Sequence, residues 1–474
     1  MARLRYRELV AENARLRRII ARQDEQLQAQ ARRIHNLELL VEQLREQLEI
    51  VQRQQKRQAA PFAKEPPKSD PQPPGRRPGA DYGPKAHRPA PKPAEITESY
   101  EAPLPVSCPQ CGHSPLEATG QAEQYQVELP RQPIYRRFDI AIGQCPQCRK
   151  RVQGRHELQT SDALGAARSQ LGPVLQAFLA VLQKRLGLAY GKCVHLLKSV
   201  WGIRLSRGGV VQALARLARR VRPAVERIGH AIRAAPAVSV DETGWRIGGH
   251  SAWLHTQVTD RAVHYAIATT RSAEVTAQVL GWDYAGVLIH DGFRSYDTFH
   301  HAQHQQCLAH LLRRCHETLA AGVPQQSAAM VCWLQAHLRA ALAYRDRLRQ
   351  QSRWRKTVRL WVWHHEQELR DRLLRWQPRR VELLRLRHFL LRYAASLFTF
   401  LLENTDATNW RAEQALRPAV VNRKVWGGNR TPMGSHVQST LMTIVGTLER
   451  QARPVIDSLA QTLHHGNLCL RLAA

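Results

Sequence analysis

The sequence predicts a multidomain α+β protein, and three features support this fold class. The chain of 474 residues is longer than the ~250–300 residues at which a single hydrophobic core stops growing. Long segments with helical periodicity flank a central region of short, β-branched runs, which are typical of buried strands. A proline-rich stretch and two Cys-x-x-Cys pairs separate the N-terminal part from the remainder.

The net charge points to a polyanionic partner. Lys and Arg total 70 against 39 acidic residues, which gives a formal charge of +31. An excess of this size, spread along the chain, is typical of proteins that bind nucleic acid. A ribosomal-type protein or one that is merely arginine-rich is the alternative.

The sequence also predicts a cytoplasmic protein. The N-terminus is charged throughout its first turns, unlike a signal peptide. The longest apolar run, residues 389–402, is interrupted by Arg392 and is shorter than the ~20 residues of a membrane span, so we expect a buried helix there. The nine cysteines suit a reducing compartment and a metal site better than a disulfide framework.

Residues 1–58 are predicted to form a coiled coil. A 3-4 spacing runs through about six heptads, with Asn13 at an a position that would fix the register. The first column contains Ile20, Leu27, Ile34, Val41 and Leu48, and the second contains Leu9, Leu16, Leu37, Leu44 and Val51. Self-association into a parallel or antiparallel homo-oligomer is the preferred interpretation, and a long helix packed on its own chain is the alternative.

Residues 59–98 are predicted to be a disordered linker. Their prolines remove backbone donors and fix φ, and few apolar side chains are available to bury. The basic residues of this segment could touch DNA, but a plain tether is the preferred interpretation.

Residues 99–158 are predicted to form a four-cysteine zinc-binding domain. The pairs Cys108/Cys111 and Cys145/Cys148 would present four thiolates to one tetrahedral ion, and the alternating stretches at 124–129 and 135–142 suit a β-ribbon. With all positions filled by thiolate, the zinc would be structural. An iron–sulfur or redox dithiol site is the alternative.

Residues 159–234 are predicted to be helical, with a pattern like that of a helix-turn-helix. Gly202 would end a helix over 190–200, and Ser206 would cap a helix over 207–221. One face of the preceding segment carries Leu171, Val174, Leu175, Phe178, Leu179 and Leu182. A groove-binding role would use Arg204, Arg207, Arg216, Arg219 and Arg220. An ordinary packed pair of helices is an equally good interpretation.

Residues 235–312 are predicted to form the first part of a sheet-containing core. A strand ending at Asp241, strands at 251–259 and 262–268, a helix over 271–280 and a strand leading to Asp291 follow one another. Three antiparallel strands, a helix and a fourth strand are the opening order of a ribonuclease H-like fold. In that fold the first and fourth strands are adjacent, so Asp241 and Asp291 would be neighbours.

Residues 313–402 are predicted to be a helical insertion, followed by the second part of the core (403–450) and a helical tail (451–474). The insertion is dense in arginine between 353 and 380, so its basic faces could bind phosphates. A solvated face without a partner is the alternative. Its tryptophans, which are expected to fill a core, are Trp354, Trp361, Trp363 and Trp376.

Three acidic residues are candidates for a metal centre. Asp241 and Asp291 follow predicted strands, and Glu413 lies in a predicted helix. Together they could hold two Mg²⁺ ions, or Mn²⁺ in their place, for an in-line phosphoryl displacement. The competing carboxylates are Glu242, Asp260, Asp283, Asp297, Glu403 and Asp406. A glycosidase pair of acids suits the positive charge poorly, and the sequence contains neither a Gly-x-Ser-x-Gly elbow nor a phosphate-binding Gly-x-x-x-x-Gly-Lys loop.

Several stretches resemble the transposase of the insertion-sequence-66 family. They are 240–245 (Val-Asp-Glu-Thr-Gly-Trp), 290–296 (His-Asp-Gly-Phe-Arg-Ser-Tyr), 306–313 (Gln-Cys-Leu-Ala-His-Leu-Leu-Arg), 408–418 (Thr-Asn-Trp-Arg-Ala-Glu-Gln-Ala-Leu-Arg-Pro) and 423–430 (Arg-Lys-Val-Trp-Gly-Gly-Asn-Arg). The resemblance covers nearly the whole chain. The sequence departs from the family pattern at Gln414, where an arginine is usual, and at Trp410, where a second asparagine is frequent.

The resemblance implies a DDE transposase that cleaves and joins double-stranded DNA at transposon ends and at a target. Asp241, Asp291 and Glu413 match the three catalytic acids of the family, and association with the bacterial nucleoid is expected. The need for helper proteins stays open. Asn409, Arg423, Lys424 and Arg430 are predicted to contact DNA, whereas His310 is predicted to be structural. The alternatives are a non-catalytic DNA-binding regulator and a ribonuclease H-like nuclease without strand transfer.

Overall fold

A computed structural model of the chain describes residues 91–99, 132–164, 170–350 and 357–472, with isolated positions between 12 and 37 and between 105 and 123. The chain divides into two compact units, Met1–Gln126 and Val127–Ala474.

In the first unit, every described position between Glu12 and Leu37 is helical. The heptad residues among them are about half exposed, and they are Leu16, Ile20, Leu27, Ile34 and Leu37. Exposed apolar columns on a helix are what a coiled coil would cover, so self-association stays a prediction. Residues 59–90 of the predicted linker lie outside the described residues, and the 3₁₀ turn η1 (Pro93–Glu95) follows them.

The second unit begins with a short antiparallel hairpin of β1 (Ile142–Gln144) and β2 (Arg151–Gln153). The predicted strand over 135–142 is wrong for all but its last residue, because residues 135–141 form no strand. A strand forms only where a second segment offers hydrogen-bond partners. The hairpin around the turn at Cys145 pairs only Ile142–Gln144 with Arg151–Gln153. The other predicted strand, at 124–129, lies outside the described residues.

A set of helices follows, as predicted, although it begins later than residue 159. The elements are α2 (Pro173–Ala180), the π-helical turn η3 (Val181–Arg185), α3 (Tyr190–Trp201) and α4 (Arg207–Arg233). Gly202 ends α3 with φ of 67°, and the Ser206 hydroxyl caps α4 by accepting from the Gly209 N–H at 3.0 Å. Of the apolar residues predicted to share one helix face, Leu179 and Leu182 are buried, whereas Val174 is 59% exposed.

The centre of the unit is a five-stranded mixed sheet with the order β5-β4-β3-β6-β7. Its strands are β3 (Ala237–Ile247), β4 (His250–Val258), β5 (Val263–Ala268), β6 (Val287–His290) and β7 (Gln303–Gln306). The predicted antiparallel meander is confirmed, as is the adjacency of the first and fourth strands, which pair in parallel. Strand β7 was not predicted, because its sequence, Gln-His-Gln-Gln, carries no apolar signal.

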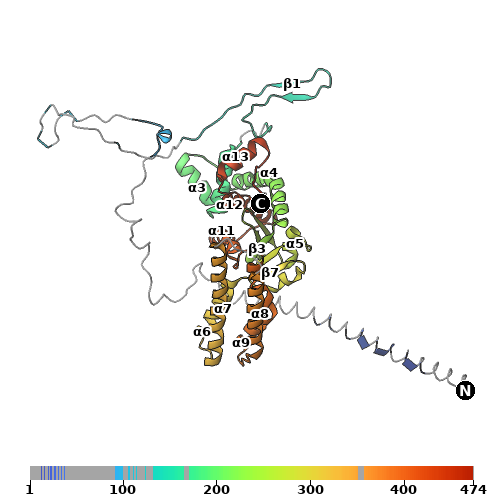
Figure 1. The fold of residues 1–474 in the computed structure, drawn as a ribbon. Helices are drawn as coiled ribbons and strands as arrows, with labels where there is room; N and C mark the ends of the chain where they lie inside the picture. Colours follow the sequence, from blue (N-terminus) through green and yellow to red (C-terminus); the bar gives the residue numbers. More distant parts are fainter. Residues whose placement is uncertain are drawn as a thin grey trace. The chain divides into compact units, whose positions relative to one another are not determined.

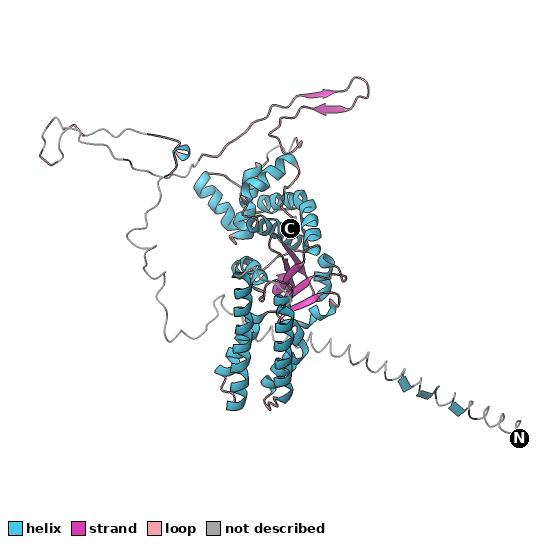
Figure 2. Cartoon of the chain, viewed as in Figure 1, coloured by secondary structure: helices cyan, strands magenta, loops and turns pink. Residues whose placement is uncertain are grey.

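Helices cover the sheet on both faces (Figure 2). They are α5 (Ala273–Leu280), the 3₁₀ turn η4 (Arg294–Thr298), α11 (Trp410–Trp426), α12 (Pro432–Arg450) and α13 (Val455–His465). Helix α4 shares one core with Val238 and Val240 of β3, whereas α11 packs on Trp245 of the same strand. Along the sheet edge, Thr443 and Thr447 of α12 accept hydrogen bonds from β5 backbone N–H groups, which blocks further strand pairing there.

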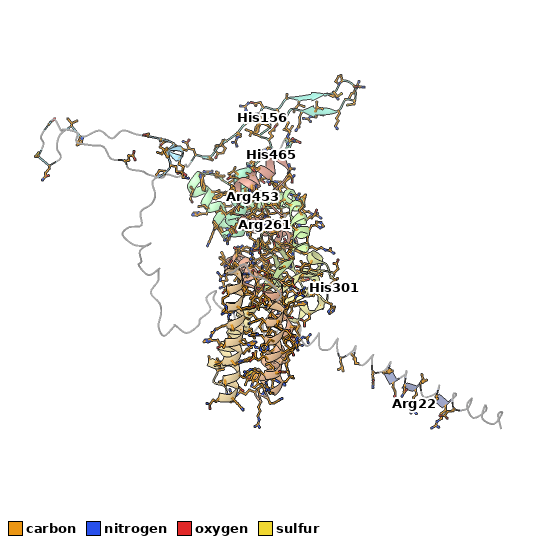
Figure 3. All side chains as sticks on the ribbon, in the orientation of Figure 1. Arg22, His156, Arg261, His301, Arg453 and His465 are labelled. Carbon is orange, nitrogen blue, oxygen red and sulfur yellow. The ribbon has the colours of Figure 1, made fainter. Side chains whose placement is uncertain are left out.

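The segment predicted to be a helical insertion is helical (Figure 1). It has its own apolar core. Its helices are α6 (Leu308–Ala320), α7 (Gln325–Gln350), α8 (Thr357–Arg375), α9 (Val381–Tyr393) and α10 (Thr399–Leu402), with the 3₁₀ turn η5 (Ala394–Leu397) before α10. Nitrogen-tipped side chains project from these helices (Figure 3). Trp361 packs against the core, but Trp363 is 60% exposed, contrary to the prediction.

The apolar run at 389–402 is divided among α9, η5 and α10, and most of its side chains are buried in the insertion core. Among the described residues, no helix has the length and apolar character needed to cross a bilayer.

Lys184 is an unusual member of the core, and it leads to a stability prediction. Its side chain is 1% exposed, Nζ donates to Gln438 Oε1 at 2.6 Å, and burial lowers its pKa to about 7. The unfolded chain therefore binds an extra proton between about pH 7 and 10.5, so this lysine destabilises the fold at neutral pH and the cost disappears as pH rises. We expect Lys184→Met to raise the free energy of unfolding at pH ~7 by on the order of 1–3 kcal/mol, and by less at pH ~10.

Urea denaturation at the two pH values measures this effect, with Lys198→Met on the exposed face of α3 as the control. A Lys184→Met protein that is less stable than wild type at neutral pH would contradict the account.

Candidate active site

Strand alternation directs Asp241 and Glu242 to opposite faces of the sheet. Val238 and Val240 belong to the core shared with α4, whereas Trp245 belongs to the core shared with α11. Because successive side chains of a strand alternate, Asp241 faces α11 with Trp245, and Glu242 faces the other core. From the sequence, either carboxylate could be the metal ligand. In the structure they lie on opposite faces of the sheet.

The predicted strand end at Asp241 is wrong. Strand β3 continues to Ile247 because it pairs with β4 through Gly244, which lies opposite Trp253. Only the parallel pairing with β6 stops early, at Ser239 and Ile289. Asp241 therefore lies just beyond the last parallel pair of β3, and Asp291 directly follows β6, so the two aspartates leave adjacent strands at the same edge.

Helix α11, which carries Glu413, is fixed to β3 and β5 by hydrogen bonds along its length. Asn409, at the helix start, donates through Nδ2 to the Val240 carbonyl at 2.9 Å. The Tyr265 hydroxyl on β5 donates to the Ala415 carbonyl at 2.6 Å, and Arg423 near the helix end donates to the Gly244 carbonyl. Glu413 lies in the first turn of this helix.

The three predicted acids interact electrostatically. The pKa of Asp241 is raised to about 7, chiefly by burial and then by the negative charges of Asp291, Glu242 and Glu413, while a hydrogen bond from the Glu242 backbone N–H lowers it. Asp291 Oδ1 accepts from the Phe293 N–H at 2.9 Å, which orients that carboxylate in the turn after β6. A buried carboxylate crowded by others is a favourable place for a cation.

The competing carboxylate Glu242 is already engaged in an ion pair and a hydrogen bond. Its Oε1 pairs with Arg271 at 2.6 Å, and its Oε2 accepts from the Tyr296 hydroxyl at 2.5 Å. The Arg271 guanidinium also lies over the Phe293 ring at 3.9 Å. Glu242 thus connects β3 to the segment that follows β6. It helps to fix Asp241 and Asp291 from the opposite face of the sheet.

Two histidines, the buried His290 and the half-buried His304, support the same segment. The Gly292 N–H donates to His290 Nδ1 at 3.2 Å, so His290 Nε2 carries the proton that is shared with His304 Nδ1 at 3.0 Å. The second nitrogen of His304 then donates to the Phe299 carbonyl at 3.1 Å. Burial, and then His304, lower the pKa of His290 to about 3, so it stays neutral and positions Asp291.

The other competing aspartates are paired elsewhere. Asp283 binds Arg233, Asp297 binds Arg392 and Tyr393, and both Asp260 and Asp406 bind Arg411. Glu403 lies at the end of α10 and is exposed. None of these groups appears among the causes of the Asp241 pKa shift.

Sequence reasoning placed His310 outside the chemistry, but the structure places it beside Glu413. The distance from His310 Nδ1 to Glu413 Oε1 is 3.6 Å. The pKa of His310 is raised to about 9, chiefly by the Cys307 thiol and also by Glu413 and Asp291, against the effect of burial. The signal in the sequence is the Cys-x-x-His spacing, which puts both side chains at the start of one helix.

The four predicted DNA contacts have different environments. Lys424 and Arg430 are exposed, and Arg423 is half-buried with its guanidinium bonded to β3. Asn409 is fully buried and donates to Val240, so it is placed to anchor α11 and not to touch DNA.

The Gly-rich segment after α11 is pinned to the end of β3. Asn429 exchanges backbone hydrogen bonds with Arg246 and Gly248, and its Oδ1 accepts from Trp245 Nε1 at 2.8 Å. Gly428 has φ of 124°, and a Cβ there would lie 2.5 Å from the Arg246 carbonyl oxygen. Only glycine fits this close approach.

We expect Gly428→Ala to lower the free energy of unfolding by about 2–4 kcal/mol, because it adds both backbone strain and a clash with β3. Urea denaturation measures the change. The matched control is Gly229→Ala in α4, where a Cβ meets nothing within 4 Å and alanine favours the helix. Equal effects of the two substitutions would contradict this assignment.

Two of the four predicted zinc ligands, Cys145 and Cys148, lie in the turn between β1 and β2. Hydrogen bonds from the backbones of Cys148 and Gln147, and from the Cys148 side chain, lower the pKa of the Cys145 thiol. Arg149 adopts φ of 56° as the chain reverses, and N–H groups directed at sulfur are typical of metal-binding cysteine turns. Cys111 is exposed in the first unit, and Cys108 lies outside the described residues.

Comparison with known proteins gives one family. The model described as "Transposase IS66 family" matches residues 168–437, a range that contains Asp241, Asp291, His310 and Glu413. The comparison with curated proteins finds no match.

Proposed function

Because the chain belongs to the IS66 transposase family, we propose that it cleaves DNA at the ends of an insertion sequence and joins the freed 3′ ends to target DNA. The observation that carries this proposal is the electrostatic coupling of Asp241 with Asp291 and Glu413, which come from β3, the end of β6 and α11. Membership of a transposase family implies DNA as the partner, and the formal charge of +31 agrees with it.

The three carboxylates fit divalent cations. They offer hard oxygen donors, and the raised pKa of Asp241 reflects burial first and then neighbouring negative charge, which a cation would compensate. Asp241, Asp291 and Glu413 would hold Mg²⁺, or Mn²⁺ in its place. When bound, two such ions would stabilise the charge that develops on the attacking and leaving oxygens of a phosphoryl displacement.

The surrounding residues would hold the three carboxylates in position. Glu413 is held by a helix that is hydrogen-bonded to β3 through Asn409 and Arg423, and Asp241 is backed by the Glu242 and Arg271 pair. The acids therefore need little reorganisation when DNA binds. The exposed side chains of Lys424 and Arg430 would hold the phosphate backbone near them.

The strand order supports a ribonuclease H-like core. Three antiparallel strands continue into two parallel ones, with β3 in the middle, and the helical insertion separates β7 from the Glu413 helix. This order puts the ends of β3 and β6 side by side, as the proposal needs.

More DNA contacts are proposed for two basic surfaces. In the helix-turn-helix-like part, all five predicted arginines are exposed: Arg204, Arg207, Arg216, Arg219 and Arg220. In the insertion, the exposed ones are Arg359, Arg372, Arg375, Arg379 and Arg380. The structural zinc, homo-oligomerisation through the N-terminal helix and any helper protein remain proposals from the sequence.

The proposal is tested with supercoiled plasmid that carries the inverted repeats flanking the gene. We expect Mg²⁺-dependent or Mn²⁺-dependent nicking at the repeats and then joined products with a second DNA. Nicking without joined products would indicate a nuclease. Binding without any nicking in either metal would indicate a DNA-binding regulator and would overturn the proposal.

A further inference from the structure

Cys307, His310 and Glu413 bring three different donor atoms together beside the acid cluster. The Cys307 sulfur, a His310 ring nitrogen and a Glu413 carboxylate oxygen all lie within 4.8 Å of one another. Cys307 is the N-cap of α6, His310 lies in the first turn of that helix, and Glu413 lies in the first turn of α11. Two helix starts thus converge on one point.

The spacing suits a tetrahedral ion. Ligands at ~2.1 Å from such an ion are separated from each other by about 3.4 Å. His310 Nδ1 and Glu413 Oε1 are already 3.6 Å apart. The sulfur needs to approach by only a small side-chain adjustment, since it lies within 4.8 Å of both other atoms.

The surroundings of Cys307 suit a metal ligand. The Asn409 backbone N–H donates to Cys307 Sγ at 3.2 Å, and the sulfur lies at the N-terminus of α6, where the helix dipole is positive. Cys307 is 2% exposed and is not in a disulfide. A backbone N–H directed at sulfur is a common outer contact of metal-bound cysteines.

His310 Nδ1 is a candidate ligand atom that lies 3.6 Å from Glu413 Oε1. This atom is buried and, among the described residues, has no hydrogen-bond partner. A buried nitrogen without a partner costs free energy, and a metal ion would satisfy it.

We propose that Cys307, His310 and Glu413 bind a thiophilic divalent transition metal such as Zn²⁺, with water as the fourth ligand, at a site separate from the Mg²⁺ ligands except for the shared Glu413. A thiolate and an imidazole select Zn²⁺, Co²⁺ or Cd²⁺ over Mg²⁺. If the proposed function holds, on which this consequence rests, Zn²⁺ there withdraws Glu413 from Mg²⁺ and inhibits DNA cleavage.

Cobalt titration of the full-length protein tests the site without an activity assay. Tetrahedral Co²⁺ bound to thiolate gives visible bands and a near-ultraviolet charge-transfer band. The wild type should bind one more equivalent of Co²⁺ than Cys307→Ser, whereas Cys332→Ser, an exposed cysteine in α7, should match the wild type. Equal stoichiometry in the wild type and Cys307→Ser overturns the proposal.

A second variant distinguishes the loss of a metal ligand from the misfolding of the protein. His310→Gln changes a side chain that is 34% exposed, and it should also lose one equivalent of Co²⁺ while keeping the circular dichroism of the wild type. Unchanged stoichiometry in a folded His310→Gln protein overturns the proposal.

The regulatory consequence is measured separately. Micromolar Zn²⁺ should reduce Mg²⁺-dependent cleavage at least about tenfold. Cobalt binding at Cys307 in a protein that never cleaves DNA refutes the proposed function and leaves the metal site standing. Cleavage that Zn²⁺ does not inhibit, together with unchanged cobalt stoichiometry in Cys307→Ser, refutes the metal site and leaves the function standing.

Discussion

Asp241→Asn is expected to reduce strand cleavage by about a thousandfold or more while leaving binding to transposon ends nearly unchanged. Asp241 is a half-buried member of the acid cluster, and its charge interacts with both Asp291 and Glu413. An amide of the same shape keeps the packing but cannot supply the negative charge that holds a divalent cation. Glu413→Gln should have the same effect, measured as nicked plasmid at saturating Mg²⁺.

The matched control is Asp260→Asn. Asp260 is an exposed carboxylate in the turn after β4, paired with Arg411 and absent from the acid cluster. It should retain cleavage within a few-fold of wild type. Metal-dependent cleavage retained by both Asp241→Asn and Glu413→Gln would refute the assignment of the acids.

The same Asp241→Asn substitution should stabilise the metal-free protein. The folded-state pKa of Asp241 is raised from 3.8 to about 7, so the stability linked to this group is present below pH ~4 and is lost as pH rises through ~7. At about pH 8 in a chelator, the free energy of unfolding of Asp241→Asn should therefore exceed that of wild type by on the order of a few kcal/mol. The variant should accordingly unfold at a higher temperature. A gain in stability with a loss of cleavage distinguishes an active-site carboxylate from a structural one.

The second large effect is expected at the predicted zinc site. Replacing Cys145 and Cys148 together by serine should remove about one equivalent of zinc per chain and unfold the hairpin of β1 and β2, because few apolar contacts hold so small an element without a metal. All six strand residues of this hairpin are exposed. Zinc content is measured by elemental analysis of the purified full-length protein.

The control for this pair is the double substitution Cys332→Ser and Cys469→Ser, which changes two exposed cysteines outside the two Cys-x-x-Cys pairs. It should leave the zinc content unchanged. Equal zinc content in both double variants would contradict the zinc prediction.

The sequence predicted the elements that carry strong periodicity. The antiparallel meander and the helix α5 follow from the periodicity and turn residues of this region, and the adjacency of β3 and β6 follows from the ribonuclease H-like order of the elements. The length of β3 was missed, because Gly244 reads as a turn in isolation. The partner strand β4 keeps it extended, and that interaction is tertiary.

The site could be predicted only as three acids in separate segments. Choosing Asp241 over Glu242 needs the pleat of β3, which decides which carboxylate faces α11. Likewise, His310 looked like a structural residue, because nothing in one sequence shows that the starts of α6 and α11 meet. Asn409 was expected to touch DNA, whereas its burial against Val240 makes it an anchor of the helix.

The most direct test of the central claim is the location of Mn²⁺ by anomalous X-ray scattering from crystals of the full-length protein. We expect anomalous peaks within about 2.5 Å of carboxylate oxygens of Asp241, Asp291 and Glu413 together. Mn²⁺ bound away from these three side chains, in a protein that still cleaves DNA with Mn²⁺, would contradict the claim.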